Sequence, residues 1–230
     1  MPNLLHDDEG DSISEKNRSY CELTGQYWAW QNTDADYYGF LHYRRYFNFS
    51  KTEYPIHHEP FIFGDVTFDR NDDETLQRID FNEEAMRKVI TAHDFIAPEP
   101  IEALEKTTVY EQYRDSFGHH IEDLDTVMDN IRLKYPDIWP SAQKYLNQTK
   151  VYVCNMFVMR RELFRAYSAF LFDVLSTHEK MRDFSHYSPV ARRVSGYLGE
   201  RICGMYLTYL YDKGYDGIDL QRVYFRNTDD

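Results

Sequence analysis

Residues 37–47 constrain the fold of this chain most, because an apolar, aromatic stretch runs directly into a histidine and two adjacent arginines. The composition of residues 37–41 is that of a short buried strand. Open α/β sheets bind ligands at the carboxyl ends of their strands, and guanidinium groups bind anions well. The segment therefore predicts either an anion site at His42, Arg44 and Arg45 or, alternatively, solvated or ion-paired surface arginines.

A helix followed by a strand recurs along the chain, which indicates an α/β domain. The pattern Ser-Ile-Ser-Glu at residues 12–15 fits a capping box, so a helix is expected to begin near Glu15 and to lead into the strand at 37–41. Asn82 can cap the next helix, which precedes a strand at residues 94–98.

The second half of the chain predicts one central strand and two long helices. Residues 151–159 are nearly continuous in apolar side chains, as in a central strand, and Asn155 is the one amide among them. Apolar residues at helical spacing predict a helix over 163–175 and another that opens at Ser188 and closes at Gly214.

Less regular segments lie between these elements. Residues 109–135 form a polar helical region, whereas residues 48–80 show no sustained period and are expected to be a long loop. Cys21, Cys154 and Cys203 are odd in number and far apart, so reduced core residues are expected at these positions.

Length and charge limit the function classes. The 230 residues are enough for a single domain with its own core. A net charge of −13 argues against binding of nucleic acid or an anionic membrane by bulk electrostatics. Because the sequence has no apolar run long enough to span a bilayer and no signal-peptide pattern at its start, a cytoplasmic protein is expected.

Metal ligands are offered at three places, of which the pair His57 and His58 in an unpatterned segment is the weakest. Asp34 and Asp36 have the two-carboxylate spacing that nucleotide-sugar enzymes use for Mg²⁺ or Mn²⁺, but they precede their strand and are interpreted first as a helix-to-strand turn. His119 and Asp123 have ligand-competent atoms, yet the adjacent His119 and His120 would point about 100° apart on a helix. Asp34, Asp36, His119 and Asp123 stay candidates without a well-placed metal motif.

Four blocks of the sequence carry a resemblance to a known family. They are residues 14–25 (SEKNRSYCELTG) with 27–30 (YWAW), 36–47 (DYYGFLHYRRYF), 154–164 (CNMFVMRRELF) and 193–201 (RVSGYLGER). These blocks resemble a bacterial family of domains of unknown function found in capsular and exopolysaccharide synthesis proteins, whose members are taken to be glycosyltransferases. The resemblance implies a GT-A-like α/β fold with a mixed sheet flanked by helices and a helical C-terminal portion.

The resemblance also implies how the domain is organised. Family members usually begin with an additional strand and loop, and this chain begins after that element, so an N-terminally truncated single domain over residues 1–230 is expected. Residues 1–100 are assigned to the nucleotide-sugar side and residues 101–230 to the acceptor side.

Glycosyl transfer needs a charge sink for the departing diphosphate, a base for the acceptor hydroxyl if configuration inverts, and a groove that orients both sugars. Since strand residues alternate in direction, His42 and Arg44 are expected to share a face. A salt bridge from Glu200 to Arg201 or Arg193 remains the structural alternative to catalysis. The assignments are Glu200 and His42 for catalysis, Arg44, Arg45, Lys16 and Asn17 for the donor diphosphate, and Asn155, Tyr43 and Arg201 for the sugar or acceptor.

The predicted function is transfer of a sugar from a nucleotide-diphosphate donor, expected to be UDP-linked, to a growing capsular or exopolysaccharide acceptor. A lipid-linked acceptor would place the protein at the inner face of the plasma membrane, and Mn²⁺ or Mg²⁺ would be optional. The alternatives are a non-catalytic carbohydrate- or nucleotide-binding module and, third, a metal-dependent hydrolase.

Overall fold

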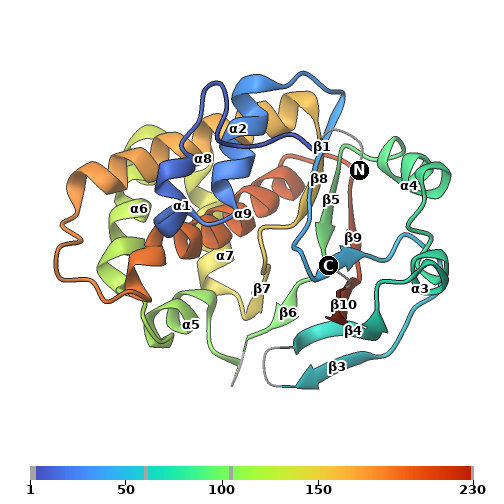
Figure 1. The fold of residues 1–230 in the computed structure, drawn as a ribbon. Helices are drawn as coiled ribbons and strands as arrows, with labels where there is room; N and C mark the ends of the chain where they lie inside the picture. Colours follow the sequence, from blue (N-terminus) through green and yellow to red (C-terminus); the bar gives the residue numbers. More distant parts are fainter. Residues whose placement is uncertain (1–3, 60–61, 104–105, 229–230) are drawn as a thin grey trace.

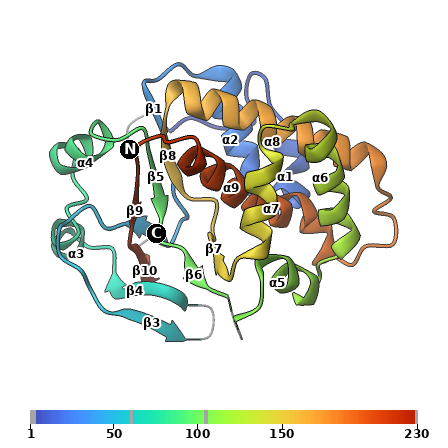
Figure 2. The ribbon, with the colours of Figure 1, turned by 180° about the vertical axis from the view of Figure 1, so that it is seen from behind.

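The protein combines strands that form three sheets with helices packed beside them (Figures 1 and 2). The structure is a computed structural model and describes residues 4–59, 62–103 and 106–228. The strands are β1 (Tyr37–Phe40), β2 (Arg45–Phe47), β3 (Ile56–Glu59), β4 (Ile62–Arg70), β5 (Phe95–Pro98), β6 (Ile101–Glu102), β7 (Lys150–Val151), β8 (Phe157–Arg160), β9 (Gly217–Leu220) and β10 (Arg222–Asn227).

Two groups of helices flank the strands, a large one that includes α8 and α9 and a small one of α3 and α4 (Figure 1). The helices are α1 (Asn17–Tyr20), α2 (Leu23–Asn32), α3 (Asp73–Arg78), α4 (Glu83–Ile90), α5 (Val109–Asp115), α6 (Ile121–Lys134), α7 (Trp139–Asn147), α8 (Arg161–Met181) and α9 (Val194–Asp212), with 3₁₀ turns at Ser14–Lys16 and Ala191–Arg193.

The two larger sheets are mixed. The first sheet has the order β1-β8-β5-β9, in which β5 and β9 are parallel and the other neighbours are antiparallel. The second sheet has the order β2-β10-β4-β3, in which β10 and β4 are parallel. The chain passes from the first sheet to the second twice, between β1 and β2 and between β9 and β10.

The first sheet is covered on both faces, and its strands alternate between two cores. Phe157 and Met159 of β8 belong to the large core shared with the helices, whereas Val158 belongs to a smaller core with residues of α4. In β5, Phe95 and Ile96 divide in the same way. This period of two is what a strand between two apolar layers requires, and it explains the nearly continuous apolar sequence.

A buried ion-paired cluster joins three strands of the second sheet. Asp65 in β4 is 1% exposed, and it accepts hydrogen bonds from Arg222 of β10 (2.7 Å) and Arg45 of β2 (3.1 Å). Residues 65–69 of β4 alternate between polar and apolar side chains, as in a strand, and the buried Asp65 lies on the face opposite Val66. The expectation of a long loop over residues 48–80 is therefore wrong, since β3, β4 and α3 lie there.

Several predicted elements are confirmed. The α/β class, the mixed sheet flanked by helices and the helical second half are all present. Asn82 caps α4 by accepting from the backbone N–H of Ala85 (3.0 Å), and α8 contains the predicted helix over residues 163–175. The helix expected from Glu15 is broken, because the backbone reverses at Cys21 (φ 53°) between α1 and α2.

The corner between α1 and α2 packs directly on α9. A β-carbon at Gly196 would lie 3.0 Å from Cys21 Sγ, and one at Gly199 would lie 2.6 Å from Leu23 Cδ1. Leu23 is fully buried, so it has little room to move. Glycine at these two positions of α9 therefore lets the corner approach closely enough to place its side chains beside the sheet.

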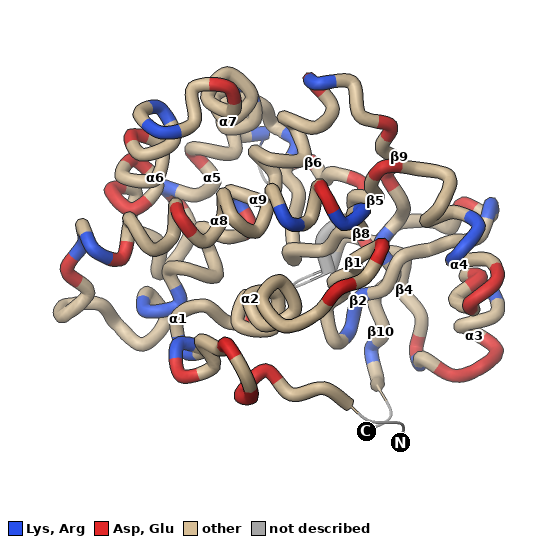
Figure 3. Tube along the Cα trace, turned by 90° about the horizontal axis from the view of Figure 1, so that it is seen from above, with Lys and Arg blue, Asp and Glu red and all other residues tan. Residues whose placement is uncertain are grey.

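Charges are distributed over the whole trace, with acidic residues gathered around α3 (Figure 3). Within the described ranges, no helix combines the length and the apolar character needed to cross a membrane.

We expect Gly199→Ala to lower the free energy of unfolding by about 1–3 kcal/mol, because the added methyl group overlaps Leu23. The matched control is Gly25→Ala in α2, where an added β-carbon would have no other atom within 4 Å, and which should raise stability by about 0.5–1 kcal/mol. Urea unfolding of both variants measures the difference. Equal stabilities would contradict the proposed close packing of the corner on α9.

Candidate functional site

A tight turn lies between β1 and β2 and carries the predicted cations. The carbonyl oxygen of His42 accepts the backbone N–H of Arg45 (3.0 Å), which leaves Tyr43 and Arg44 at the tip. The expectation that strand alternation puts His42 and Arg44 on one face is wrong, because residues 41–44 have left the strand. Both side chains nevertheless line the same cavity.

A second bend lies immediately before β8. The expected continuous strand over residues 151–159 is interrupted, because Cys154 (φ 75°) and Asn155 (φ 46°) both have left-handed backbones. Asparagine adopts a left-handed backbone more readily than most residues do, but two successive non-glycine residues in this conformation are strained. The interruption turns Cys154 and Asn155 toward the cleft instead of into the sheet.

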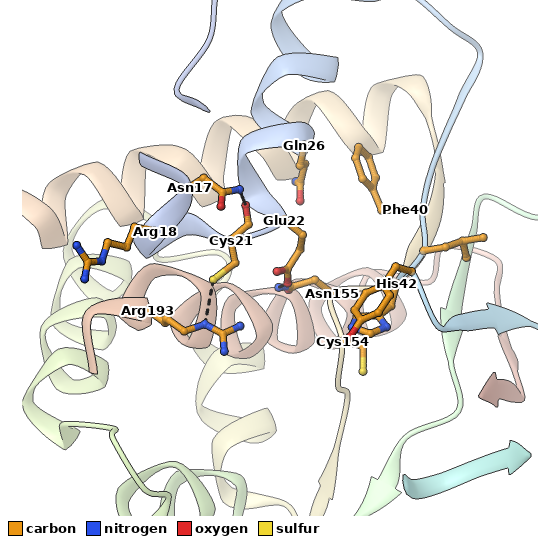
Figure 4. A pocket seen from close by; sticks show the side chains of 12 residues that line it. Asn17, Arg18, Cys21, Glu22, Gln26, Phe40, His42, Cys154, Asn155 and Arg193 are labelled. Atoms are coloured by element: carbon orange, nitrogen blue, oxygen red, sulfur yellow. Dashed lines mark hydrogen bonds between the residues drawn. The ribbon is translucent and has the colours of Figure 1, made fainter. Parts of the chain in front are cut away.

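Strand register brings the two bends together. β1 and β8 are antiparallel with Phe40 opposite Phe157, so the residues after β1 lie beside those before β8. The α1–α2 corner, seated on α9, closes the third side of the cleft (Figure 4).

The cleft consists of two adjoining cavities of about 560 and 780 Å³. Together they contain eight of the nine residues assigned above to catalysis, the donor or the acceptor, which are His42, Arg44, Asn155, Glu200, Asn17, Tyr43, Arg45 and Arg201. The residues that line both cavities are Cys21, Glu22, His42, Tyr43, Cys154 and Arg193.

The arginines of the cleft differ in what holds them. Arg45 pairs with buried Asp65, so it has a structural task, whereas Arg44 stands over the ring of Tyr43, with its guanidinium carbon 5.2 Å from the ring centre. Arg201 is 3% exposed, donates to Gln112 Oε1 and lies 3.6 Å (Nη1) from Glu200 Oε2. The cleft is thus locally cationic in an acidic protein.

Two carboxylates face these cations. Glu200 on α9 accepts the backbone N–H of Cys154 (3.1 Å), and burial raises the pKa of its carboxyl, while Arg201 opposes that rise. Glu22 at the α1–α2 corner accepts from Asn155 Nδ2 (2.7 Å). Figure 4 shows the Glu22 and Asn155 side chains meeting within the cleft.

Two histidines of the cleft are neutral near physiological pH. Burial, followed by the charges of Arg45 and Arg44, lowers the pKa of His42 to about 4, and burial and Arg201 lower the pKa of His119 to about 4. His42 Nδ1 accepts the backbone N–H of Arg44 (3.2 Å), so its proton is assigned to Nε2. His42 therefore presents a hydrogen-bond donor to a ligand.

Two predicted diphosphate residues are placed differently. Lys16 forms an ion pair with Glu179 (2.7 Å) and does not belong to the lining of either cavity. Asn17 lines the smaller cavity, where its Nδ2 donates to the carbonyl of Cys21.

Tyr43 lies in the cleft and is 69% exposed, which suits stacking on a ligand ring.

The metal candidates are engaged in other interactions. Asp34 and Asp36 pair with Arg161, as expected of a helix-to-strand turn. Asp123 is fully buried and accepts from His178 (2.9 Å) and the hydroxyl of Tyr187 (2.8 Å). Across residues 4–59, 62–103 and 106–228, no three His, Cys, Asp or Glu side chains gather as a metal site would require.

Sequence reasoning missed Glu22, Arg193 and Gln112 as residues of the cleft. Glu22 belongs to the block at residues 14–25 that carries the resemblance. If every polar residue of this block had been treated as a candidate site residue, Glu22 would have been included. All three cysteines are free thiols, but the expectation of core positions holds for Cys203 alone. Cys21 and Cys154 line the cleft, and Arg193 Nε donates to Cys21 Sγ (3.4 Å).

The mixed sheet, its helical cover and the cleft at the end of β1 define a GT-A-like domain. A solved structure described as the WbbM bifunctional glycosyltransferase in its apo state matches 96% of this chain with a TM-score of 0.88 and 32% identity. This chain spans 39% of the length of that protein.

The family is defined by a separate comparison. Residues 1–211 match the family described as a domain of unknown function, DUF4422, and the chain belongs to that family. No curated protein matches this sequence.

We predict that His42 weakens the fold in mild acid. Because its folded pKa lies below the ordinary value of 6.5, the unfolded chain binds more protons between pH 6.5 and about 4, so stability falls as pH falls through this window. His42→Gln should reduce the slope, measured as unfolding free energy against pH. The imidazole NMR signal lost in this variant should titrate near pH 4, and an unchanged slope would contradict the prediction.

Proposed function

We propose that this chain is a glycosyltransferase domain that transfers a sugar from a nucleotide-diphosphate donor to a saccharide acceptor. The observation that carries the proposal is the convergence of cationic and carboxylate side chains on one cleft of a GT-A-like fold. The matching solved structure, which is described as a bifunctional glycosyltransferase, supports the same reaction class.

In this proposal, the departing diphosphate is stabilised by Arg44 and by the Nε2–H of neutral His42. Guanidinium groups bind phosphate oxygens with two parallel hydrogen bonds, and a neutral histidine adds a donor without adding competing charge. Preorganised donors of this kind stabilise charge that develops in the transition state. Arg45 holds the turn through Asp65, which keeps Arg44 in place.

The fold class often uses a divalent metal for the same task. The carboxylate pair with the spacing of a metal motif does not fit that group, since Asp34 and Asp36 pair with Arg161 and lie outside both cavities. Arg44 and His42 therefore stabilise the negative charge of the departing diphosphate.

The finer assignments belong to the proposal as well. The donor is UDP-linked, and the acceptor is a growing capsular or exopolysaccharide chain carried on a lipid at the inner face of the plasma membrane. Residues 1–100 form the donor side and residues 101–230 the acceptor side. The resemblance to polysaccharide synthesis proteins supports these assignments, as does a cleft whose walls come from both halves of the chain.

A panel of nucleotide sugars, each with and without Mn²⁺, tests the reaction class. Donor cleavage and transfer to a saccharide are expected. Donor binding without cleavage would favour a non-catalytic binding module, and Mn²⁺-dependent cleavage of other substrates would favour a hydrolase.

We expect Arg44→Ala to lower turnover on the order of 10²-fold, because one preorganised donor to the leaving group is lost. Its melting temperature should stay close to that of the unchanged protein, since Arg44 lies at the tip of a turn. Arg87→Ala on exposed α4 is the matched control and should leave turnover unchanged. Normal kinetics of Arg44→Ala would end the assignment.

A further inference from the structure

The Glu22 side chain lines the cleft and is hydrogen-bonded through one of its two carboxylate oxygens. Its Oε1 accepts the Nδ2–H of Asn155 at 2.7 Å, and its residue lines both cavities. Within the part of the chain that the structure describes, no hydrogen bond or ion pair engages the second oxygen, Oε2. One oxygen is thus anchored while the other remains open to a ligand.

The anchor is rigid. Asn155 is 5% exposed and lies in the strained bend directly before β8, whose pairing with β1 fixes its direction. The α1–α2 corner that carries Glu22 is equally fixed, since Cys21 and Leu23 pack against glycines of α9. The orientation of the carboxylate is therefore set by two rigid elements and not by its own flexible stem.

Glu200 differs from Glu22 in this respect. One of its oxygens accepts the backbone N–H of Cys154 (3.1 Å), and the other lies 3.6 Å from Arg201 Nη1. Both oxygens of Glu200 thus interact with the protein. Glu200 stabilises the bend that presents Asn155, which makes it a positioning residue.

Glu22 and the cations of the turn lie on different walls of the cleft, and Arg193, which also lines both cavities, lies on the helical side with Glu22. Glu22 belongs to the helical wall, whereas His42 and Arg44 belong to the turn after β1. Figure 4 shows His42 on the other side of Asn155 from Cys21 and Arg193. A diphosphate at the turn would leave the anomeric carbon between the cations and the carboxylate.

We propose that Glu22, oriented by Asn155, is the general base that deprotonates the acceptor hydroxyl, and that the transfer inverts the anomeric configuration. This inference rests on the proposed function and replaces Glu200 with Glu22 in the catalytic role.

The step balances as a single displacement. The acceptor oxygen attacks the anomeric carbon, and its proton passes to Glu22 Oε2 as the new glycosidic bond forms. The bond from the anomeric carbon to the phosphate oxygen breaks, and its electron pair stays on the nucleoside diphosphate, next to Arg44 and His42. Attack from the face opposite the leaving group gives an inverted product.

Transfer to two different acceptors distinguishes a catalytic base from a residue with a structural role. A sugar hydroxyl needs deprotonation, whereas azide is already an anion and needs no base. Glu22→Gln should lower the kcat for transfer to a saccharide by about 10²–10⁴-fold while glycosyl azide formation stays within about twofold of the unchanged protein. NMR of the azide product should show inverted configuration.

Asn155 is tested as a positioning residue by Asn155→Gly, which keeps the left-handed backbone and removes the amide. Saccharide transfer should fall about tenfold or more and azide transfer should not, whereas a merely structural role would lower both. Glu162→Gln, an exposed residue of α8, is the matched control and should transfer normally to both acceptors.

Two results would overturn the assignment while leaving the proposed function intact: normal saccharide transfer by Glu22→Gln, or an equal fall in saccharide and azide transfer. A retained anomeric configuration would overturn the single displacement. Failure of the proposed function is distinguishable, because the unchanged protein would then neither bind nor cleave any nucleotide sugar in calorimetry and hydrolysis assays, and the base assignment would fall with it.

Discussion

The antiparallel pairing of β1 with β8 is the constraint on which the cleft depends. With Phe40 opposite Phe157, the chain leaving β1 and the chain entering β8 must run side by side. Each bends there, at the His42–Arg45 turn and at Cys154–Asn155. A shift of the register by one residue would exchange the two cores and separate the bends, since side-chain direction alternates along a strand.

Buried charge secures the cationic wall of this cleft. Asp65 holds Arg45 and Arg222, and thereby ties β2 and β10 to β4. A buried ion pair contributes little net stability relative to apolar residues, but loss of one partner leaves an uncompensated charge, which costs about 3–5 kcal/mol. For function, the ion pair between Asp65 and Arg45 matters because it fixes the position of the turn that carries Arg44.

Much of the fold and part of the site could be predicted from local patterns. Helix α4 follows from its Asn82 cap and apolar spacing, and α8 from apolar periodicity over several turns. Strand β4 was missed although residues 65–69 alternate between polar and apolar side chains; the partner of its buried Asp65, Arg222, lies 157 residues away. The turn with Arg44 was predicted as a candidate site because a histidine and two arginines follow an apolar stretch. The argument that strand alternation places His42 and Arg44 on one face was wrong. Glu22 was missed because only the fold shows that it accepts a hydrogen bond from Asn155, 133 residues further along the chain.

The sequence by itself determined the α/β class, the main helices and the presence of anion-binding side chains after β1, because periodicity, caps and charge are local properties. Only the tertiary structure decided which charges reach the cleft. Lys16 pairs with Glu179 and lies outside the cleft lining, Arg45 lines the cleft but pairs with Asp65, and Arg44, Glu22 and Asn155 also line the cleft. The physical reason is that each of these outcomes depends on a partner far along the chain, brought close by strand register and by the glycines of α9.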